Sequence, residues 1–251
     1  MDYHDLNGRE RGETVFIIGA GPQLGLLPDD VLAALSDRPT IGVNLTQYRV
    51  RPRYFLSSYA EQHILARHRA PDAIQIHVSD VYGPPVLDYL LVLKRQLFEP
   101  ETTLPPALAG PEPALVTKGN ICLAATHLAL VFGAKAIVYV GVEQENSLHF
   151  YHMNPAAREA IDGDIEILRR YDHIPREFKY RTYHVVRDLL EADPAVLAET
   201  PFVARQEALF AEYFRQLGEF GISVFSSTSS GVAIDAGAAY LPIDQCLALS
   251  P

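Results

Sequence analysis

Cysteine and positive charge are both scarce in this sequence. Only two of its 251 residues are cysteines, Cys122 and Cys246, and neither has the C-x-x-C or Cys–His spacing of a zinc or redox site. We therefore expect a reducing, cytoplasmic setting and no metal site. Lysine and arginine number 21 against 31 acidic residues, for a formal net charge of -10. Because a nucleic-acid backbone is bound by clustered positive charge, we expect no nucleic-acid partner.

Long apolar runs are also missing. The N-terminal segment MDYHDLNGRERGE is polar and charged, and no run reaches the roughly 18 apolar residues that a membrane-spanning helix needs. The sequence therefore predicts neither membrane insertion nor secretion. What remains is an ordinary globular composition, with 48% apolar and 21% charged residues, and a length that suits one α/β domain over 1–251.

Short β-branched runs alternate with helical segments in the first part of the chain. Apolar runs of strand length occur at 15–19, 40–44, 53–58 and 73–78. The segment 29–35, behind the first run, is compatible with a helix. This alternation predicts a mostly parallel sheet covered by helices on both faces, an α/β fold of the Rossmann type.

The second part of the chain continues the alternation after a proline-rich stretch at 100–113, which predicts a surface loop or crossover. The segment 119–143 predicts a buried helix and a central strand, and 205–227 predicts the last helix and strand. Between them, 144–201 is polar, rich in histidine, arginine and aromatic residues, and weakly periodic. This composition predicts a helical, lid-like insert over the site.

The turn GAGPQLG at 19–25 directly follows the first predicted strand. Glycine lets the backbone turn sharply and approach a phosphate, and the following helix offers free N–H groups. We therefore expect the segment 15–24 to hold the phosphates of a nucleotide-bearing ligand; a tight turn without ligand is the alternative. A dinucleotide is less expected, because Asn44 stands at the end of the second strand where such sites have an acid. Its amide suits a ribose hydroxyl or a base edge.

Four blocks of the sequence resemble, in order, a bacterial superfamily. They are FIIGAGPQL, GVNLTQYRVRPRYFLSS, KGNICLAATHLALVFGAKAIVYVGVE and GISVFSSTSSG. The superfamily includes CMP-sialic acid-dependent sialyltransferases, motility accessory factor proteins and 6-hydroxymethylpterin diphosphokinase-like proteins. The resemblance implies the Rossmann-like fold, and its sialyltransferase branch implies transfer of a sugar from a nucleotide donor.

The resemblance also implies ligand contacts. In the sialyltransferases a G-N-G-P-S-L turn holds the CMP phosphate, an asparagine after the second strand contacts the nucleotide, and the start of the central helix lies near the donor. A turn after the last strand completes the site, and in this chain it is a run of hydroxyl residues suited to a sugar or phosphate, with a solvated loop as the alternative. The implied positions are Gly19, Gly21, Pro22, Gln23, Asn44, Gly119, Asn120, Ser227, Thr228 and Ser229.

Candidate catalytic groups follow from the chemistry of sugar transfer, which needs a base for the acceptor hydroxyl. The family's histidine before the last helix has no counterpart here. His149 is our first choice and His184 the second, with a solvated or structural histidine as the alternative. Glu143 and Glu145, expected on one face of a strand end, suit a base, sugar hydroxyls or a metal, or form a charged loop edge.

These observations lead to a glycosyltransferase-like enzyme of the sialyltransferase type, with a nucleotide sugar as substrate and no separate cofactor. A diphosphokinase-like phosphoryl transferase is one alternative, although 45–58 contains no acid where that branch has its metal-binding motif. A nucleotide-binding protein without catalysis is the other. Arg49, Arg51 and Arg53 form either a cationic rim or a solvated strand edge. The acceptor, the sugar and a homo-oligomeric state are left open.

Overall fold

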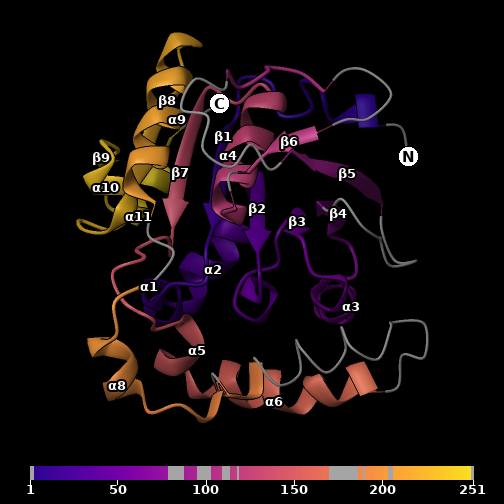
Figure 1. Cartoon of the computed structure of the whole chain (residues 1–251), viewed down its shortest axis with the longest axis vertical. Helices are drawn as coiled ribbons and strands as arrows, with labels where there is room; N and C mark the ends of the chain where they lie inside the picture. Colours follow the sequence, from indigo (N-terminus) through magenta and orange to yellow (C-terminus); the bar gives the residue numbers. More distant parts are fainter. Residues whose placement is uncertain are drawn as a thin grey trace.

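A parallel sheet of nine strands runs through the computed structural model, which describes residues 3–78, 88–94, 103–108, 114–117, 119–169, 186–188, 190–202 and 206–249. The strand order is β6-β5-β4-β3-β2-β1-β7-β8-β9, and every neighbouring pair is parallel. The strands are β1 (Thr14–Ile18), β2 (Thr40–Val43), β3 (Tyr54–Ser57), β4 (Ile74–Val78), β5 (Tyr89–Lys94), β6 (Ala114–Val116), β7 (Ala136–Val140), β8 (Ser223–Ser226) and β9 (Ala239–Tyr240). The expected α/β fold of the Rossmann type is confirmed (Figure 1).

Helices cover both faces of the sheet, which explains why β1, β2 and β7 are buried along their whole length. The described helices are α1 (Pro22–Leu26), α2 (Asp29–Ser36), α3 (Ala60–Arg69), α4 (Ile121–Val131), α5 (Phe150–Met153), α6 (Pro155–Arg169), α8 (Pro194–Glu199), α9 (Glu207–Glu219), α10 (Val232–Asp235) and α11 (Ile243–Leu247), with short 3-10 turns η1 (Tyr3–Leu6) and η2 (Thr46–Tyr48). None of these helices is both long enough and apolar enough to cross a membrane.

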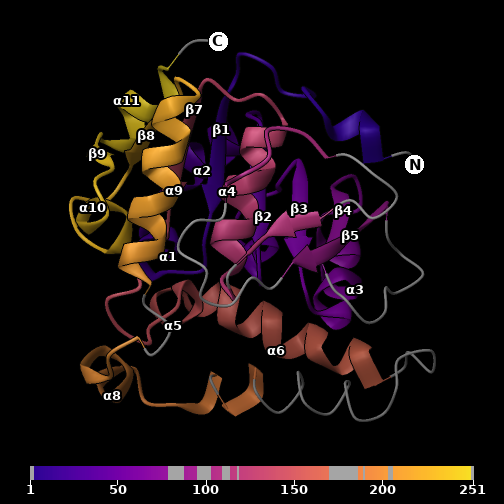
Figure 2. The same cartoon turned by 45° about the horizontal axis from the view of Figure 1, so that its top comes forward.

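The alternation of side chains along β1 shows how the two faces form. Val15 and Ile17 lie in the core with residues of α4 and α9, whereas Phe16 and Ile18 lie in a second cluster with residues of α2, α3 and α6. In both views, α5, α6 and α8 gather beyond the end of the sheet to which the arrowhead of β7 points (Figures 1 and 2). The described part of the insert thus lies at the carboxyl ends of the strands.

The predicted insert, 144–201, is more regular than its sequence suggested. Within it, α6 buries Ala157, Ile161, Ile165 and Leu168, whose spacing forms one helical stripe in the same cluster as Phe16. The expectation of weak periodicity is therefore wrong for α6, which packs as a core layer. Residues 170–185 and 189 lie outside the described residues, and opening as a lid stays a prediction.

The proline-rich stretch is a loop where it is described. Residues 103, 105, 106 and 107 are exposed, as predicted for a surface loop or crossover. Leu104 and Leu108 anchor this piece in the core, and the Leu104 N–H donates to Gln216 Oε1 over 2.7 Å. The rest of 100–113 lies outside the described residues.

Candidate functional site

The strand order reverses between β1 and β7. From β1 the chain proceeds through β2 to β6 on one side, and it then returns to place β7, β8 and β9 on the other side. Open α/β sheets bind ligands outside the carboxyl ends of the strands at such a switch point. The turn after β1 and the loop after β7 therefore define the candidate site.

Backbone hydrogen bonds join these two segments. Gly19 N–H donates to Val140 O, and Gly21 N–H donates to Gly141 O, both over 2.8 Å. A Cβ atom on Gly21 would collide with the Glu143 carboxylate, and one on Gly19 would collide with Gly141 O. Glycine is thus required here because two protein loops approach closely. The space that the sequence assigned to a phosphate beside Gly21 is occupied by Glu143.

Glu143 is the buried acid at the centre of the site. Its Oε1 accepts the Gln23 N–H over 2.8 Å, at the N-terminal end of the five-residue helix α1. Its Oε2 is buried and has no hydrogen-bond partner among the described residues. Burial raises the pKa of Glu143, while the backbone N–H groups of Gln23 and Glu143 itself act in the opposite direction. A carboxylate therefore takes the N–H position at which a phosphate was expected.

The two acids after β7 differ in environment. The strand ends at Val140, so Glu143 and Glu145 lie in the following loop, where strand alternation does not apply. Glu143 is buried and Glu145 is exposed. The expected pair on one strand face is therefore wrong, although both acids line the same cavity.

Gln23 connects the β1 turn to the loop after β8. Its Nε2 donates to Ser227 O over 3.0 Å, and its Oε1 accepts from Ser227 Oγ over 2.9 Å. The Thr228 hydroxyl pairs with Ser226 Oγ over 2.9 Å. Two of the hydroxyls expected to contact ligand thus hold the loop in place, whereas Ser229 is exposed.

Two cavities meet at Glu143. The first, which we name the outer cavity, has a volume of about 400 Å³ and is lined by Pro22, Gln23, Leu26, Glu143, Gln144, Glu145, Asn146, Ser227, Thr228, Ser229, Ser230 and Tyr240. The second, the inner cavity, holds about 60 Å³ and is lined by Gly19, Ala20, Gly21, Asn44, Cys122, Gly141, Val142, Glu143, Gln144, Asn146, Leu148, His149 and Phe202. Glu143, Gln144 and Asn146 form their common wall.

Most sequence-predicted positions come together at this wall, with three exceptions. Gly119 and Asn120 line neither cavity, and Asn120 Oδ1 caps α4 by accepting the Cys122 N–H over 2.9 Å. Cys122 itself reaches the inner cavity. His184 lies outside the described residues.

Two residues of the site have left-handed backbones. Asn44 has φ 60° and Gln144 has φ 52°, a region that residues other than glycine adopt rarely, asparagine more readily than glutamine. Gln144 was missed by the sequence analysis, and its buried Oε1 has no partner among the described residues. Only its place directly after Glu143, beyond a central strand, pointed to it.

The His149 ring is held neutral in one tautomer. Its Nδ1 lies 3.0 Å from Ser147 O. Because a carbonyl oxygen only accepts hydrogen bonds, Nδ1 carries the proton and Nε2 carries a lone pair. Burial, together with nearby His152, lowers the pKa of His149 to about 4. His149 is therefore a weaker base than an ordinary histidine.

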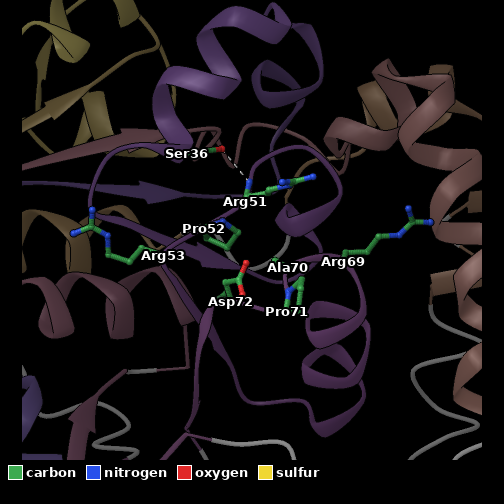
Figure 3. Close-up of a pocket in the computed structure, with 9 residues that line it drawn as sticks. Ser36, Arg51, Pro52, Arg53, Arg69, Ala70, Pro71 and Asp72 are labelled. Atoms are coloured by element: carbon green, nitrogen blue, oxygen red, sulfur yellow. Dashed lines mark hydrogen bonds between the residues drawn. The ribbon is translucent and has the colours of Figure 1, made fainter.

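A third cavity lies at the opposite edge of the sheet, before β3 and β4. This amino-edge cavity has a volume of about 380 Å³ and is lined by Ser36, Arg51, Pro52, Arg53, Arg69, Ala70, Pro71, Asp72 and Ala73. In Figure 3 the Arg53 side chain extends to one side of the cavity, and the Arg51 and Arg69 side chains extend to the other. Arg53 pairs with Glu10 over 3.1 Å, and Arg69 pairs with Asp164.

The other interpretation of Arg49, Arg51 and Arg53, a solvated strand edge, is wrong. Strand β3 begins at Tyr54, after the arginines, and Arg49 turns back to donate to Leu27 O over 2.8 Å. The arginines thus do not converge on one anion.

Within the described segments, no group of three or more histidine, cysteine, aspartate or glutamate side chains is arranged to hold a metal ion. No protein-family model matches the chain, and no curated protein matches its sequence. Among solved structures, the MAf glycosyltransferase from Magnetospirillum magneticum AMB-1 has a similar fold, with a TM-score of 0.50 and 14% identity. The likeness covers 94% of this chain and 34% of the other, so the chain spans about a third of that protein.

Proposed function

We propose that the chain is a glycosyltransferase-like enzyme that transfers a sugar from a nucleotide-sugar donor at the β1/β7 switch point. The main support is the pair of cavities there, whose common wall contains a buried carboxylate oxygen with no partner in the part of the chain that the structure describes. The similar fold of a protein described as a MAf glycosyltransferase adds to this support. The sialyl character that the sequence resemblance implies stays part of the proposal.

The chemistry needs one proton acceptor. A base takes the proton of the acceptor hydroxyl, the new bond forms at the anomeric carbon, and the bond to the phosphate breaks so that the nucleotide leaves. Glu143 fits the role better than His149, because burial raises the pKa of the carboxyl group and lowers that of the imidazole. We therefore propose Glu143 as the base, in place of the first choice from sequence.

A nucleotide-binding protein without catalysis is the second candidate. It is favoured by the Glu143 carboxylate at the N–H end of α1, because that carboxylate has to move before a phosphate can take the same hydrogen bond. Release of free nucleotide from a nucleotide sugar separates the two candidates.

The test is thermal unfolding with CMP, UDP, GDP and their sugar conjugates, followed by assays for released nucleotide. A nucleotide at 100 times its Kd should stabilise the fold by roughly 2.7 kcal/mol. We expect turnover to persist in EDTA and to be lost in Glu143→Gln. Binding without turnover would support the second candidate, and no stabilisation by any nucleotide at millimolar concentration would contradict both.

A further inference from the structure

The outer cavity is acidic, although a nucleotide that binds nearby is itself negatively charged. Among the described residues, its lining includes two carboxylates, Glu143 and Glu145, and no lysine, arginine or histidine. A phosphate or a sugar acid placed there would meet like charge, with no counter-ion among these residues. The cavity is therefore electrostatically unsuited to the anionic part of a donor.

Two buried oxygens in the wall of the outer cavity can accept hydrogen bonds from a ligand. Glu143 Oε2 and Gln144 Oε1 are both buried, both lack partners among the described residues, and both belong to residues that line the cavity. A buried acceptor left unpaired destabilises the fold, and a ligand that pairs it gains affinity. A hydroxyl or amino group of a ligand supplies the missing proton, whereas a phosphate dianion or a carboxylate has none to give.

The rim of the same cavity is apolar. Leu26 is 63% exposed and Tyr240 is 52% exposed, and both line the outer cavity. An exposed aromatic ring beside acceptor oxygens suits a ligand with an apolar C–H face and hydroxyls at its edge. A volume of about 400 Å³ accommodates a sugar ring with its substituents.

We propose that the outer cavity binds a neutral or amino-bearing sugar, which packs on Tyr240 and donates hydrogen bonds to Glu143 and Gln144. Its role as the acceptor site, with the Glu143 carboxylate next to the hydroxyl that reacts, rests on the proposed function. The binding of the sugar itself does not.

The experiment is a ligand-observed NMR titration of the full chain, without nucleotide, using galactose, N-acetylglucosamine and glucosamine as probes. N-acetylneuraminic acid and inorganic phosphate are the anionic probes. We expect at least one neutral or amino sugar to saturate in the millimolar range and the anions to bind at least tenfold more weakly. Tyr240→Ala should weaken sugar binding about tenfold and Tyr240→Phe at most twofold.

Two further variants serve as controls. Phe220→Ala removes a similarly exposed aromatic, 43% exposed, outside the cavity and should leave sugar binding unchanged. Glu145→Gln removes a negative charge at an exposed position. It should therefore reduce the difference in affinity between neutral and anionic sugars. Sugar affinity that is equal in Tyr240→Ala and the parent, tighter binding of the anions, or no saturation by any neutral or amino sugar would overturn the inference.

Nucleotide stabilisation measured on the same samples separates this inference from the proposed function. If nucleotides bind and sugars do not, only the sugar site is wrong. If sugars bind through Tyr240 and no nucleotide binds, the sugar site stands and the proposed function falls. If Tyr240→Ala loses nucleotide and keeps sugar affinity, the outer cavity holds the nucleotide and the inference is overturned.

Discussion

The outer cavity and the amino-edge cavity have nearly the same volume, about 400 and 380 Å³, at opposite ends of the sheet. The outer cavity is acidic, and buried oxygens in its wall lack partners among the described residues. The amino-edge cavity contains three arginines, yet Arg53 and Arg69 are engaged in ion pairs, and Arg53 extends away from the other two (Figure 3). Volume and residue type therefore do not identify a binding site. Buried polar atoms that still lack a hydrogen-bond partner are the more informative signal.

The largest effect is expected where the loops of the switch point interlock. Gly21→Ala places a Cβ against the Glu143 carboxylate and 2.8 Å from Gly141 O, so we expect a loss of about 2 to 3 kcal/mol in unfolding free energy. Glu143→Ala in the same chain should recover part of it, giving a coupling energy of at least about 1 kcal/mol in a double-mutant cycle. Urea unfolding measures both.

The control for that substitution is Gly163→Ala in α6, where an added Cβ meets nothing within 4 Å. It should be neutral or stabilise by up to about 1 kcal/mol. Equal losses at Gly21 and Gly163 would mean that the close packing of the two loops does not limit stability.

A smaller effect is expected from releasing an arginine of the amino-edge cavity. Asp164 on α6 pairs with Arg69 and accepts from Tyr48 Oη over 3.2 Å, which ties the insert to α3 and η2. Asp164→Ala should reduce the unfolding free energy by about 2 kcal/mol, because both partners lose a charged acceptor. Ligand binding at the switch point should not change.

Glu219→Ala is the matched control for this ion pair. It removes an exposed partner of Arg215 on α9 and should change stability by no more than about 0.5 kcal/mol. A similar loss in both variants would argue against a structural role for the Asp164 contacts.

The next effect depends on pH. Burial raises the pKa of Glu143 in the folded state, so protonation favours folding: its contribution is present at low pH and is lost as the pH rises through the raised pKa. Glu143→Gln has no such dependence. Relative to that variant, the parent should therefore gain stability between pH 7 and pH 4, as measured by urea unfolding of both. A difference that is constant, or that changes in the opposite direction, contradicts this.

The smallest effect is expected at Arg51, which is exposed at the amino-edge cavity. Arg51→Ala should leave nucleotide and sugar affinities within twofold and stability within about 0.5 kcal/mol. A tenfold loss of nucleotide affinity, with the fold intact by thermal unfolding, would move the candidate site to this edge.

The sequence predicted the fold well where strands are short, mostly apolar runs that alternate with helices, as for β1 to β4, β7 and β8. It missed β5, β6 and β9. The three residues of β6 and the two of β9 become strands only by pairing with β5 and β8. Such pairing is a long-range property, which local periodicity does not contain.

The candidate site was predictable to the same extent. Carboxyl ends of parallel strands share one edge, so the Gly19 turn and Glu143 were expected together. Glu143 fills the space beside Gly21 because β1 pairs with β7. Neither segment indicates this pairing by its own sequence. The bridge from Gln23 to Ser227 likewise depends on two segments that are far apart in the sequence, and neither segment indicates it alone.

The bridge from Gln23 to Ser227 spans 204 residues of sequence, which has a consequence for biosynthesis. Strand β1 is a central strand, yet its partner β7 emerges from the ribosome roughly 6 to 24 s after it at ordinary elongation rates. During that interval β1 presents an unpaired edge of apolar residues, the kind of edge at which nascent chains associate. Pairing with β7 closes this edge, and the Gln23–Ser227 bridge forms only after β8 and its following loop have also been synthesised.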